Sequence, residues 1–270
     1  MKKSILSLLI AGVLVLAFTQ TVGAIGNKEK SETVLSVGAT PVPHAEMLNL
    51  IKDDLAAKGI TLRVVEFTDY VQPNVALVAG DIDANFFQHI PYLETNAEWS
   101  QKLVSVFGVH IEPFGLYSHK HGSIAALPNG ATIAIPNDPT NGGRSLLLLQ
   151  ANGLITLRDG VGLTATPRDI TGNPKNFRFQ ELEAAQLPRS LDDVDAATIN
   201  GNYALQANLK PSKDSLIIEG AESPYVNIVV VQKGQENEAK ITALKNALLS
   251  QKVKDYINSN YDDGEVVPVF

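Results

Sequence analysis

The sequence predicts an α/β protein of two lobes, each a mainly parallel sheet flanked by helices, with two crossovers joining the lobes. Three observations lead to this prediction. Apolar β-type runs alternate with segments of helical periodicity along most of the chain, which favours parallel strands with crossover helices. Extended apolar runs interrupt the alternation at residues 103–117 and 226–231. The first 24 residues have the layout of an export signal.

Residues 1–24 are predicted to be a secretory signal peptide. Lys2 and Lys3 precede an apolar run at 5–18, and small residues end the segment at Ala24. The apolar run is short for a membrane span, and an uncleaved anchor is the alternative. Residues 25–32 are interpreted as a flexible tether. We therefore expect an exported protein of the periplasm or cell envelope.

The composition excludes several classes of function. The chain of 270 residues has a formal net charge of −7, which argues against nucleic acid and against binding to anionic lipid. It has no cysteine, which excludes disulfides, thiol nucleophiles and thiolate metal sites. Nor is there a cysteine to accept a lipid anchor.

The first lobe is predicted to comprise residues 33–117 and 226–270. Strands are expected at 34–39, 60–67, 82–87 and from 103, with helices at 45–58, 71–79 and 91–100. The β-branched run 226–231 returns the chain to this lobe, and helices at 236–249 and 253–258 pack on it. The second lobe is predicted at 118–225, with strands at 131–135, 177–182 and 194–199 and a helix at 142–151.

Aromatic residues gather where strands of the first lobe end. Tyr70 follows the second strand, Phe86 and Phe87 end the third, and Tyr92 follows closely. Ligands of open α/β sheets bind at the carboxyl ends of strands. The four rings therefore predict an aromatic pocket for an apolar side chain, and ordinary core packing of these rings is the alternative.

Polar candidates lie at the strand ends of the second lobe. Arg144 occupies the first turn of a predicted helix, where the helix dipole disfavours a purely structural arginine. Its guanidinium matches a carboxylate, and a surface ion pair is the alternative. Asn200, Asn202 and Asn227 could accept hydrogen bonds from an ammonium through their amide oxygens. The residues together indicate a site for an amino acid with an apolar side chain.

Other chemistries have weaker support. His119 and His121 have a spacing that can bind metal, and three further histidines are scattered at His44, His89 and His110. Residues 160–165 match GxGxxA but do not follow a convincing strand, so we interpret them as a turn. No nucleophile–base pair or metal constellation can be assembled. We expect no enzyme activity, no cofactor and no bound metal.

The strand-end motifs resemble those of the methionine-binding lipoproteins of the NlpA family, the substrate-binding components of methionine ABC importers. The matching strings are FTDYVQPN (67–74), GDIDANFFQH (80–89), IPNDPTN (135–141), GRSLLLLQ (143–150), LPRSLDD (187–193) and SPYVN (223–227). They span essentially the whole chain after the signal peptide.

The resemblance implies a two-lobed periplasmic-binding fold that holds L-methionine and delivers it to a membrane permease with an ATPase subunit. By match to the family motifs, the side-chain pocket would be lined by Tyr70, Phe87, His89 and Tyr92. Arg144 would hold the carboxylate, and Asn200 and Asn227 the polar end. Family members carry a lipid on a cysteine, which this chain lacks. The alternatives are a related amino acid, a dipeptide or a metal as ligand, or a surface adhesin or antigen.

Overall fold

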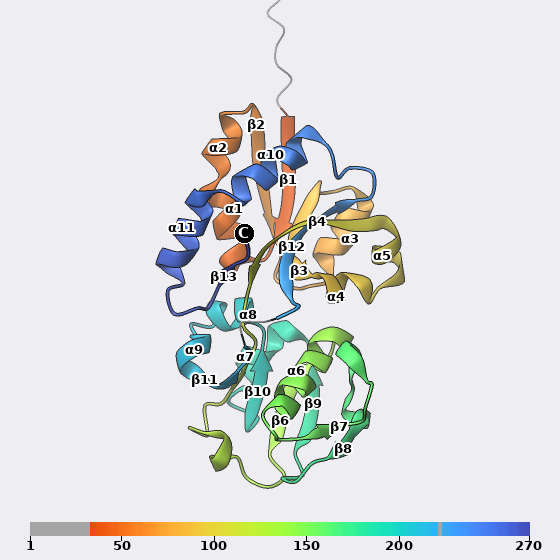
Figure 1. Ribbon diagram of the computed structural model, residues 1–270, viewed down its shortest axis with the longest axis vertical. Helices are drawn as coiled ribbons and strands as arrows, with labels where there is room; N and C mark the ends of the chain where they lie inside the picture. Colours follow the sequence, from red (N-terminus) through yellow and green to blue (C-terminus); the bar gives the residue numbers. More distant parts are fainter. Residues whose placement is uncertain (1–32, 221–222) are drawn as a thin grey trace, which may run out of the picture. The chain divides into compact units, whose positions relative to one another are not determined.

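The computed structural model describes residues 33–220 and 223–270, which form a six-stranded sheet, a five-stranded sheet and a two-stranded hairpin (Figure 1). The predicted signal peptide (1–24) and tether (25–32) lie outside the described residues. We name the elements around the six-stranded sheet the first lobe and those around the five-stranded sheet the second lobe. The predicted α/β class is confirmed.

The first lobe is discontinuous in sequence. Its sheet has the order β13-β4-β12-β3-β1-β2. The strands are β1 (Thr33–Ala39), β2 (Ile60–Glu66), β3 (Ala84–His89), β4 (Leu103–Ile111), β12 (Val226–Gln232) and β13 (Val267–Pro268). The first four run in one direction, and β12 and β13 run against them. β12, an interior strand, is therefore supplied only after the chain has passed through the second lobe.

Helices cover both faces of this sheet (Figure 1). One face packs against the turn η1 (Pro41–Ala45), α1 (Glu46–Leu50), α2 (Lys52–Ala56), α10 (Ala239–Leu248) and α11 (Gln251–Asn260), and the other against α3 (Gln72–Ala79), α4 (Ile90–Glu94) and α5 (Ala97–Lys102). Successive residues of a strand point to opposite faces. Phe86 accordingly packs with Leu35 in one core, and Phe87 packs with Leu77 in the other.

Two predicted helices are each divided in two. The segment predicted as one helix at 45–58 breaks at Ile51, which has φ −97° and ψ 4°. The segment 91–100 divides into α4 and α5 because Asn96 begins a new helix. Its amide oxygen accepts the backbone N–H groups of Glu98 and Trp99, as an N-cap residue does.

The second lobe is built on the sheet β11-β5-β10-β6-β9. Its strands are β5 (Gly115–Tyr117), β6 (Thr132–Pro136), β9 (Arg178–Leu182), β10 (Ala196–Ile199) and β11 (Ser215–Ile218), and its hairpin is β7 (Thr156–Leu157) with β8 (Ile170–Gly172). The helices are α6 (Pro139–Ala151), α7 (Leu187–Ser190), α8 (Gly201–Gln206) and α9 (Pro211–Asp214). Short turns lie at η2 (Ile124–Ala126), η3 (Gly162–Thr164), η4 (Pro167–Asp169) and η5 (Ala184–Gln186). Within this sheet only β5 runs against the other strands.

The first crossover lies earlier than predicted. The sequence analysis placed residues up to 117 in the first lobe, but β5 pairs with β10 and β11 of the second sheet. The ladder of the first sheet ends at Ile111, and Glu112, Pro113 and Phe114 join the two sheets. Pro113 lacks an N–H and interrupts what reads in sequence as one long strand.

None of the described helices is long and apolar enough to cross a membrane.

The helix α6 and the turn η3 pack so closely that Gly143 leaves no room for a side chain. A Cβ atom there would overlap the backbone carbonyl of Leu163 and lie 3.0 Å from the Ala165 nitrogen. The glycine-containing segment 160–165 is thus a turn packed on a helix, as interpreted from the sequence.

We expect Gly143→Ala to lower the free energy of unfolding by about 1–3 kcal/mol. The clash is with backbone, which can yield only by separating α6 from η3, and it outweighs the higher helix propensity of alanine. Urea unfolding measures the change. Gly122→Ala is the matched control, because nothing lies within 4 Å of a Cβ atom at Gly122. Equal stability of the two variants would contradict this packing.

Candidate ligand-binding site

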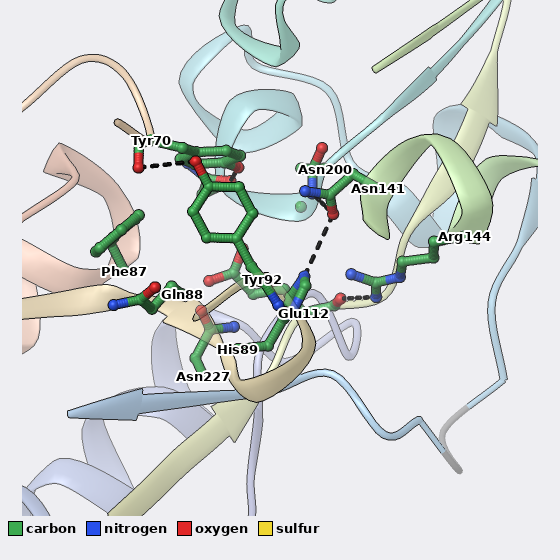
Figure 2. A pocket seen from close by; sticks show the side chains of 12 residues that line it. Tyr70, Phe87, Gln88, His89, Tyr92, Glu112, Asn141, Arg144, Asn200 and Asn227 are labelled. Carbon is green, nitrogen blue, oxygen red and sulfur yellow. Dashed lines mark hydrogen bonds between the residues drawn. The ribbon is translucent and has the colours of Figure 1, made fainter. Parts of the chain in front are cut away.

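One cavity is lined by residues of both lobes (Figure 2). The space between its lining atoms is about 350 Å³, a volume that includes open solvent. The lining residues are Tyr70, Phe87, Gln88, His89, Tyr92, Glu112, Asn141, Arg144, Asn200, Gly201, Asn202 and Asn227. The cavity is therefore small, and its lining is mostly polar with aromatic rings in one part.

All seven residues predicted as the binding site line this cavity. They are Tyr70, Phe87, His89, Tyr92, Arg144, Asn200 and Asn227. Phe86, which the sequence analysis added to the aromatic pocket, does not. It is fully buried in the core on the other face of β3, with its ring 4.7 Å from that of His44. The structure brings the seven together, and their binding of a ligand stays a prediction.

Three rings form the aromatic part of the cavity. The Tyr70 ring centroid lies 5.9 Å from those of Phe87 and Tyr92. Asp69 fixes the backbone next to Tyr70, because its carboxylate accepts the N–H groups of Val71 and Gln72. The Tyr92 hydroxyl donates to the backbone carbonyl of Tyr70 at 3.0 Å. This hydrogen bond fixes the positions of Tyr70 and Tyr92 relative to each other.

A hydrogen-bonded chain fixes the amides of the second lobe. Asp138 caps α6, and its carboxylate accepts the amide NH₂ of Asn141 at 2.9 and 3.0 Å. Because a carboxylate only accepts, the Asn141 oxygen must face away from it, toward His89 and Asn200. Asn200 donates to that oxygen at 2.9 Å. The amide oxygen of Asn200 is left buried without a partner among the described residues.

His89 belongs to the same chain of hydrogen bonds, and its imidazole is neutral. Its Nδ1 accepts the backbone N–H of Tyr92 at 3.2 Å, so the proton is on Nε2, which donates to Asn141 at 3.3 Å. Burial and the nearby Arg144 guanidinium lower the pKa of His89 to about 3. A neutral imidazole therefore links β3 to α6 across the two lobes.

Arg144 is held by both crossovers, the first between β4 and β5 and the second between β11 and β12. Its Nε donates to Glu219 at 3.0 Å, and its Nη2 donates to the same carboxylate and, at 3.1 Å, to the backbone carbonyl of Glu112. The guanidinium lies 4.1 Å from the Tyr225 ring centroid and 4.9 Å from that of Phe114. Among the described residues nothing binds Nη1, which leaves one edge of the guanidinium for a ligand.

Asn227 offers a donor where the sequence analysis expected an acceptor. The Nε2 of His44 lies 3.0 Å from the Asn227 amide oxygen and 3.4 Å from the Glu112 carboxylate. A nitrogen that faces two oxygens carries the proton, so the Asn227 oxygen already accepts one hydrogen bond. Its NH₂ group remains for the cavity. The amide suits a carboxylate better than an ammonium.

A buried cluster lies behind this part of the cavity. His110 Nε2 is 2.8 Å from the Glu112 carboxylate, and His44, His110 and Glu112 each place one ligand atom within 4.8 Å of the others. Burial lowers the pKa of His44 to about 4 and that of His110 to about 3, and it raises the pKa of Glu112. The exposed His119 and the half-buried His121 instead pair separately with Asp192 and Asp195.

The sequence analysis missed four lining residues: Gln88, Glu112, Asn141 and Gly201. A signal existed for two of them. Glu112 is a lone carboxylate in an otherwise apolar stretch, and Asn141 is three residues from Asp138 at a predicted strand-to-helix loop. Gln88 and Gly201 carry no comparable signal.

Direct hydrogen bonds join the lobes around the cavity. The Tyr70 hydroxyl donates to Asn202 at 2.5 Å, and the Tyr203 hydroxyl donates to the backbone carbonyl of Thr68 at 3.1 Å. Together with the His89–Asn141 bond, they describe a closed cleft.

Comparison with known proteins gives one consistent family. The model described as NlpA lipoprotein matches residues 35–270. Methionine-binding lipoprotein MetQ of Bacillus subtilis is 42% identical over 97% of this chain and 98% of its own. D-methionine-binding lipoprotein MetQ of Escherichia coli K12 is 43% identical over 89% of this chain and 90% of its own. A nutrient-binding protein from Burkholderia cenocepacia, solved bound to methionine, is 44% identical with a TM-score of 0.83, covering 87% of this chain and 100% of that one.

The buried histidines predict a loss of stability in mild acid. In the unfolded chain a histidine has a pKa of about 6.5, whereas burial holds those of His44, His89 and His110 near 3–4. Between pH 6.5 and about 4 the unfolded state therefore binds more protons, and the free energy of unfolding falls as the pH falls. Glu112, with its raised pKa, acts with the opposite sign. We expect a net slope of at most roughly 2.7 kcal/mol per pH unit, equivalent to two protons.

Urea unfolding at several pH values between about 7.5 and 5 measures this slope. His44→Gln should reduce it by roughly one proton. His119→Gln is the matched control, because His119 is exposed and should leave the slope as it is. Stability that does not change over this range would contradict burial of three neutral imidazoles.

Proposed function

The chain belongs to the NlpA lipoprotein family, and on that premise we propose that it is an exported receptor that binds methionine in its cleft. One observation carries the proposal. A closed cavity between the lobes has aromatic rings in one part and a guanidinium in another (Figure 2). The chemistry of the cavity suits a small amino acid with an apolar side chain.

The aromatic part of the cavity suits a thioether. Phe87 and Tyr92 are buried, and Tyr70 closes the wall over them. A sulfur atom packed about 5 Å from an aromatic ring contributes roughly 0.3–1.5 kcal/mol per contact. Methionine is also unbranched, so its side chain can follow a narrow cavity that a branched side chain of similar volume would not fit.

The polar part of the cavity suits a carboxylate. Arg144 offers its free Nη1 edge, and Asn227 offers its amide NH₂ nearby in the same cavity. Glu219 and the Glu112 carbonyl hold the guanidinium in place, so it needs little reorganisation when the ligand binds. We assign the ligand carboxylate to these two residues.

Ligand release and capture would follow from motion of the two lobes. The ligand contacts residues of both, so it stabilises the closed form over an open one. We propose that the closed receptor delivers methionine to the permease and ATPase subunits of an ABC importer. No covalent step is involved.

Calorimetry with L-methionine and D-methionine tests the proposal. We expect saturable binding of at least one enantiomer, with one ligand per chain, because one cavity holds the whole site. The protein must first be shown by mass spectrometry to be free of co-purified ligand. A panel of leucine, a dipeptide and zinc ions defines specificity. Absence of binding by either enantiomer would refute the proposed function.

Arg144→Ala should weaken methionine binding by about 2–5 kcal/mol, because it removes the charge partner of a buried carboxylate. Arg178→Ala is the matched control, since Arg178 is exposed on β9 of the same lobe. This variant should bind methionine as tightly as the unmodified protein does. Thermal unfolding verifies that both variants fold. A loss below about 0.5 kcal/mol would remove Arg144 from the site.

A further inference from the structure

His44 lies behind the ligand cavity and does not line it. It belongs to the turn η1 of the first lobe and is 1% exposed. Its ring packs edge-on against Phe86, with the ring centroids 4.7 Å apart, and its centroid is 5.0 Å from that of His110. The proposed function does not use this side chain. A histidine buried in this way nevertheless needs hydrogen-bond partners for its ring nitrogens.

The partners of the two ring nitrogens fix the position of the His44 proton. Nε2 lies 3.0 Å from the amide oxygen of Asn227 and 3.4 Å from a carboxylate oxygen of Glu112, so Nε2 carries the proton. Nδ1 lies 2.8 Å from Oγ1 of Thr40, whose hydroxyl can donate to an unprotonated nitrogen. Burial lowers the pKa of His44 to about 4, so the neutral ring has only one proton to place. His44 thus presents an N–H group to Asn227.

That N–H group determines which end of the Asn227 amide faces the cavity. An asparagine amide has a donor end and an acceptor end, and half a turn about the Cβ–Cγ bond exchanges them. Pairing of β12 with His89 of β3 and His110 of β4 fixes the backbone of Asn227, but it leaves this rotation open. The N–H of His44 attracts the amide oxygen and repels the NH₂ group. The NH₂ group is therefore turned toward the cavity, which Asn227 lines.

We propose that His44 is a positioning residue that fixes the Asn227 amide with its NH₂ group toward the ligand carboxylate. The inference rests on the proposed function and extends it, since it identifies what prepares the cavity for a carboxylate rather than a neutral carboxamide. Arg144 supplies the charge, and His44 determines that the amide adds a donor rather than an acceptor. Thr40 completes the arrangement by donating to Nδ1.

The nearby Glu112 carboxylate makes this orientation depend on His44. One oxygen of Glu112 and the oxygen of Asn227 both lie within 3.4 Å of Nε2 and share its proton. Without that proton the two acceptors would be left beside each other. The Asn227 amide would then turn its NH₂ group toward the carboxylate, because a hydrogen bond to a charged acceptor is strong. Its oxygen would face the cavity and repel a ligand carboxylate.

A role in packing alone has different consequences. If His44 only fills space beside Phe86, its replacement lowers the free energy of unfolding and weakens the binding of related ligands alike. If His44 orients the amide, its replacement weakens the binding of a carboxylate more than that of a group that can itself donate a hydrogen bond. The preference between two ligands therefore separates the two roles, whereas the affinity for one ligand does not.

The test compares methionine with methioninamide, in which an NH₂ group replaces one carboxylate oxygen. Calorimetry on ligand-free protein gives both affinities. Unmodified protein should prefer methionine by at least about 100-fold, because the amide lacks the charge that Arg144 binds. In His44→Leu this preference should fall by about 10-fold or more, mainly through weaker methionine binding. His44→Gln should keep the preference within about 3-fold, because its side-chain NH₂ group can replace the Nε2–H donor.

Leu48→Val is the matched control for lost packing. Leu48 is fully buried in the same core as Phe86 and does not line the cavity. This variant should lower the free energy of unfolding and leave the preference for methionine unchanged. Thermal unfolding verifies that each variant folds.

Nuclear magnetic resonance of the imidazole nitrogens tests the position of the proton directly. Long-range ¹H–¹⁵N correlation distinguishes a protonated from an unprotonated ring nitrogen, and the signals that His44→Gln lacks are those of His44. At neutral pH and without ligand, Nε2 should be protonated and Nδ1 should not. This measurement uses unmodified protein, so it decides even if His44→Leu fails to fold.

Four outcomes would overturn the inference. The first two are a His44 proton on Nδ1 and a preference that His44→Leu leaves unchanged. The third is a preference that His44→Gln and His44→Leu reduce equally. The fourth is a set of His44 signals that changes on dialysis against a chelator, because a metal on Nε2 would replace the proton. Protein that binds neither ligand would refute the proposed function and the inference with it, whereas the four outcomes leave the proposed function standing.

Discussion

The guanidinium of Arg144 is the point at which the two crossovers and the ligand cavity meet. Glu112 and Phe114 reach it from the first crossover, and Glu219 and Tyr225 reach it from the second. The side chain is almost fully buried, so its charge must be matched by ion pairing inside the protein. Any ligand that binds the free edge of this group therefore lies beside the two segments that join the lobes.

A second constraint comes from the short chain of hydrogen bonds that begins at Asp138. Its carboxylate fixes the Asn141 amide, which in turn fixes Asn200 and the proton of His89. Each group has one orientation because its neighbour can only accept or only donate. The cavity is consequently lined by donors and acceptors in a set order, and the Asn200 amide oxygen is left without a partner among the described residues.

The fold and most of the site were predictable because they depend on local patterns. Strand and helix periodicity located the strand ends, and Tyr70, Phe87 and Arg144 lie there. Glu112 was missed because its importance depends on His44, which is distant in sequence, and on burial that no local pattern reveals. The prediction that Phe86 lines the pocket was wrong for a local reason. Adjacent residues of a strand face opposite sides of the sheet, so only one of Phe86 and Phe87 could reach the cavity. The first crossover was misplaced because a strand that changes sheets at Pro113 keeps the same apolar pattern.

The central place of β12 has a consequence for how the protein is made. The strand lies between β3 and β4, yet it follows the entire second lobe in the chain. A nascent or translocating polypeptide that has emerged only as far as residue 225 has an open gap in its first sheet, with unpaired backbone groups on both sides. The first sheet cannot be completed cotranslationally until the last sixth of the polypeptide has been made. The first lobe therefore reaches its folded form only after the second lobe has been synthesised.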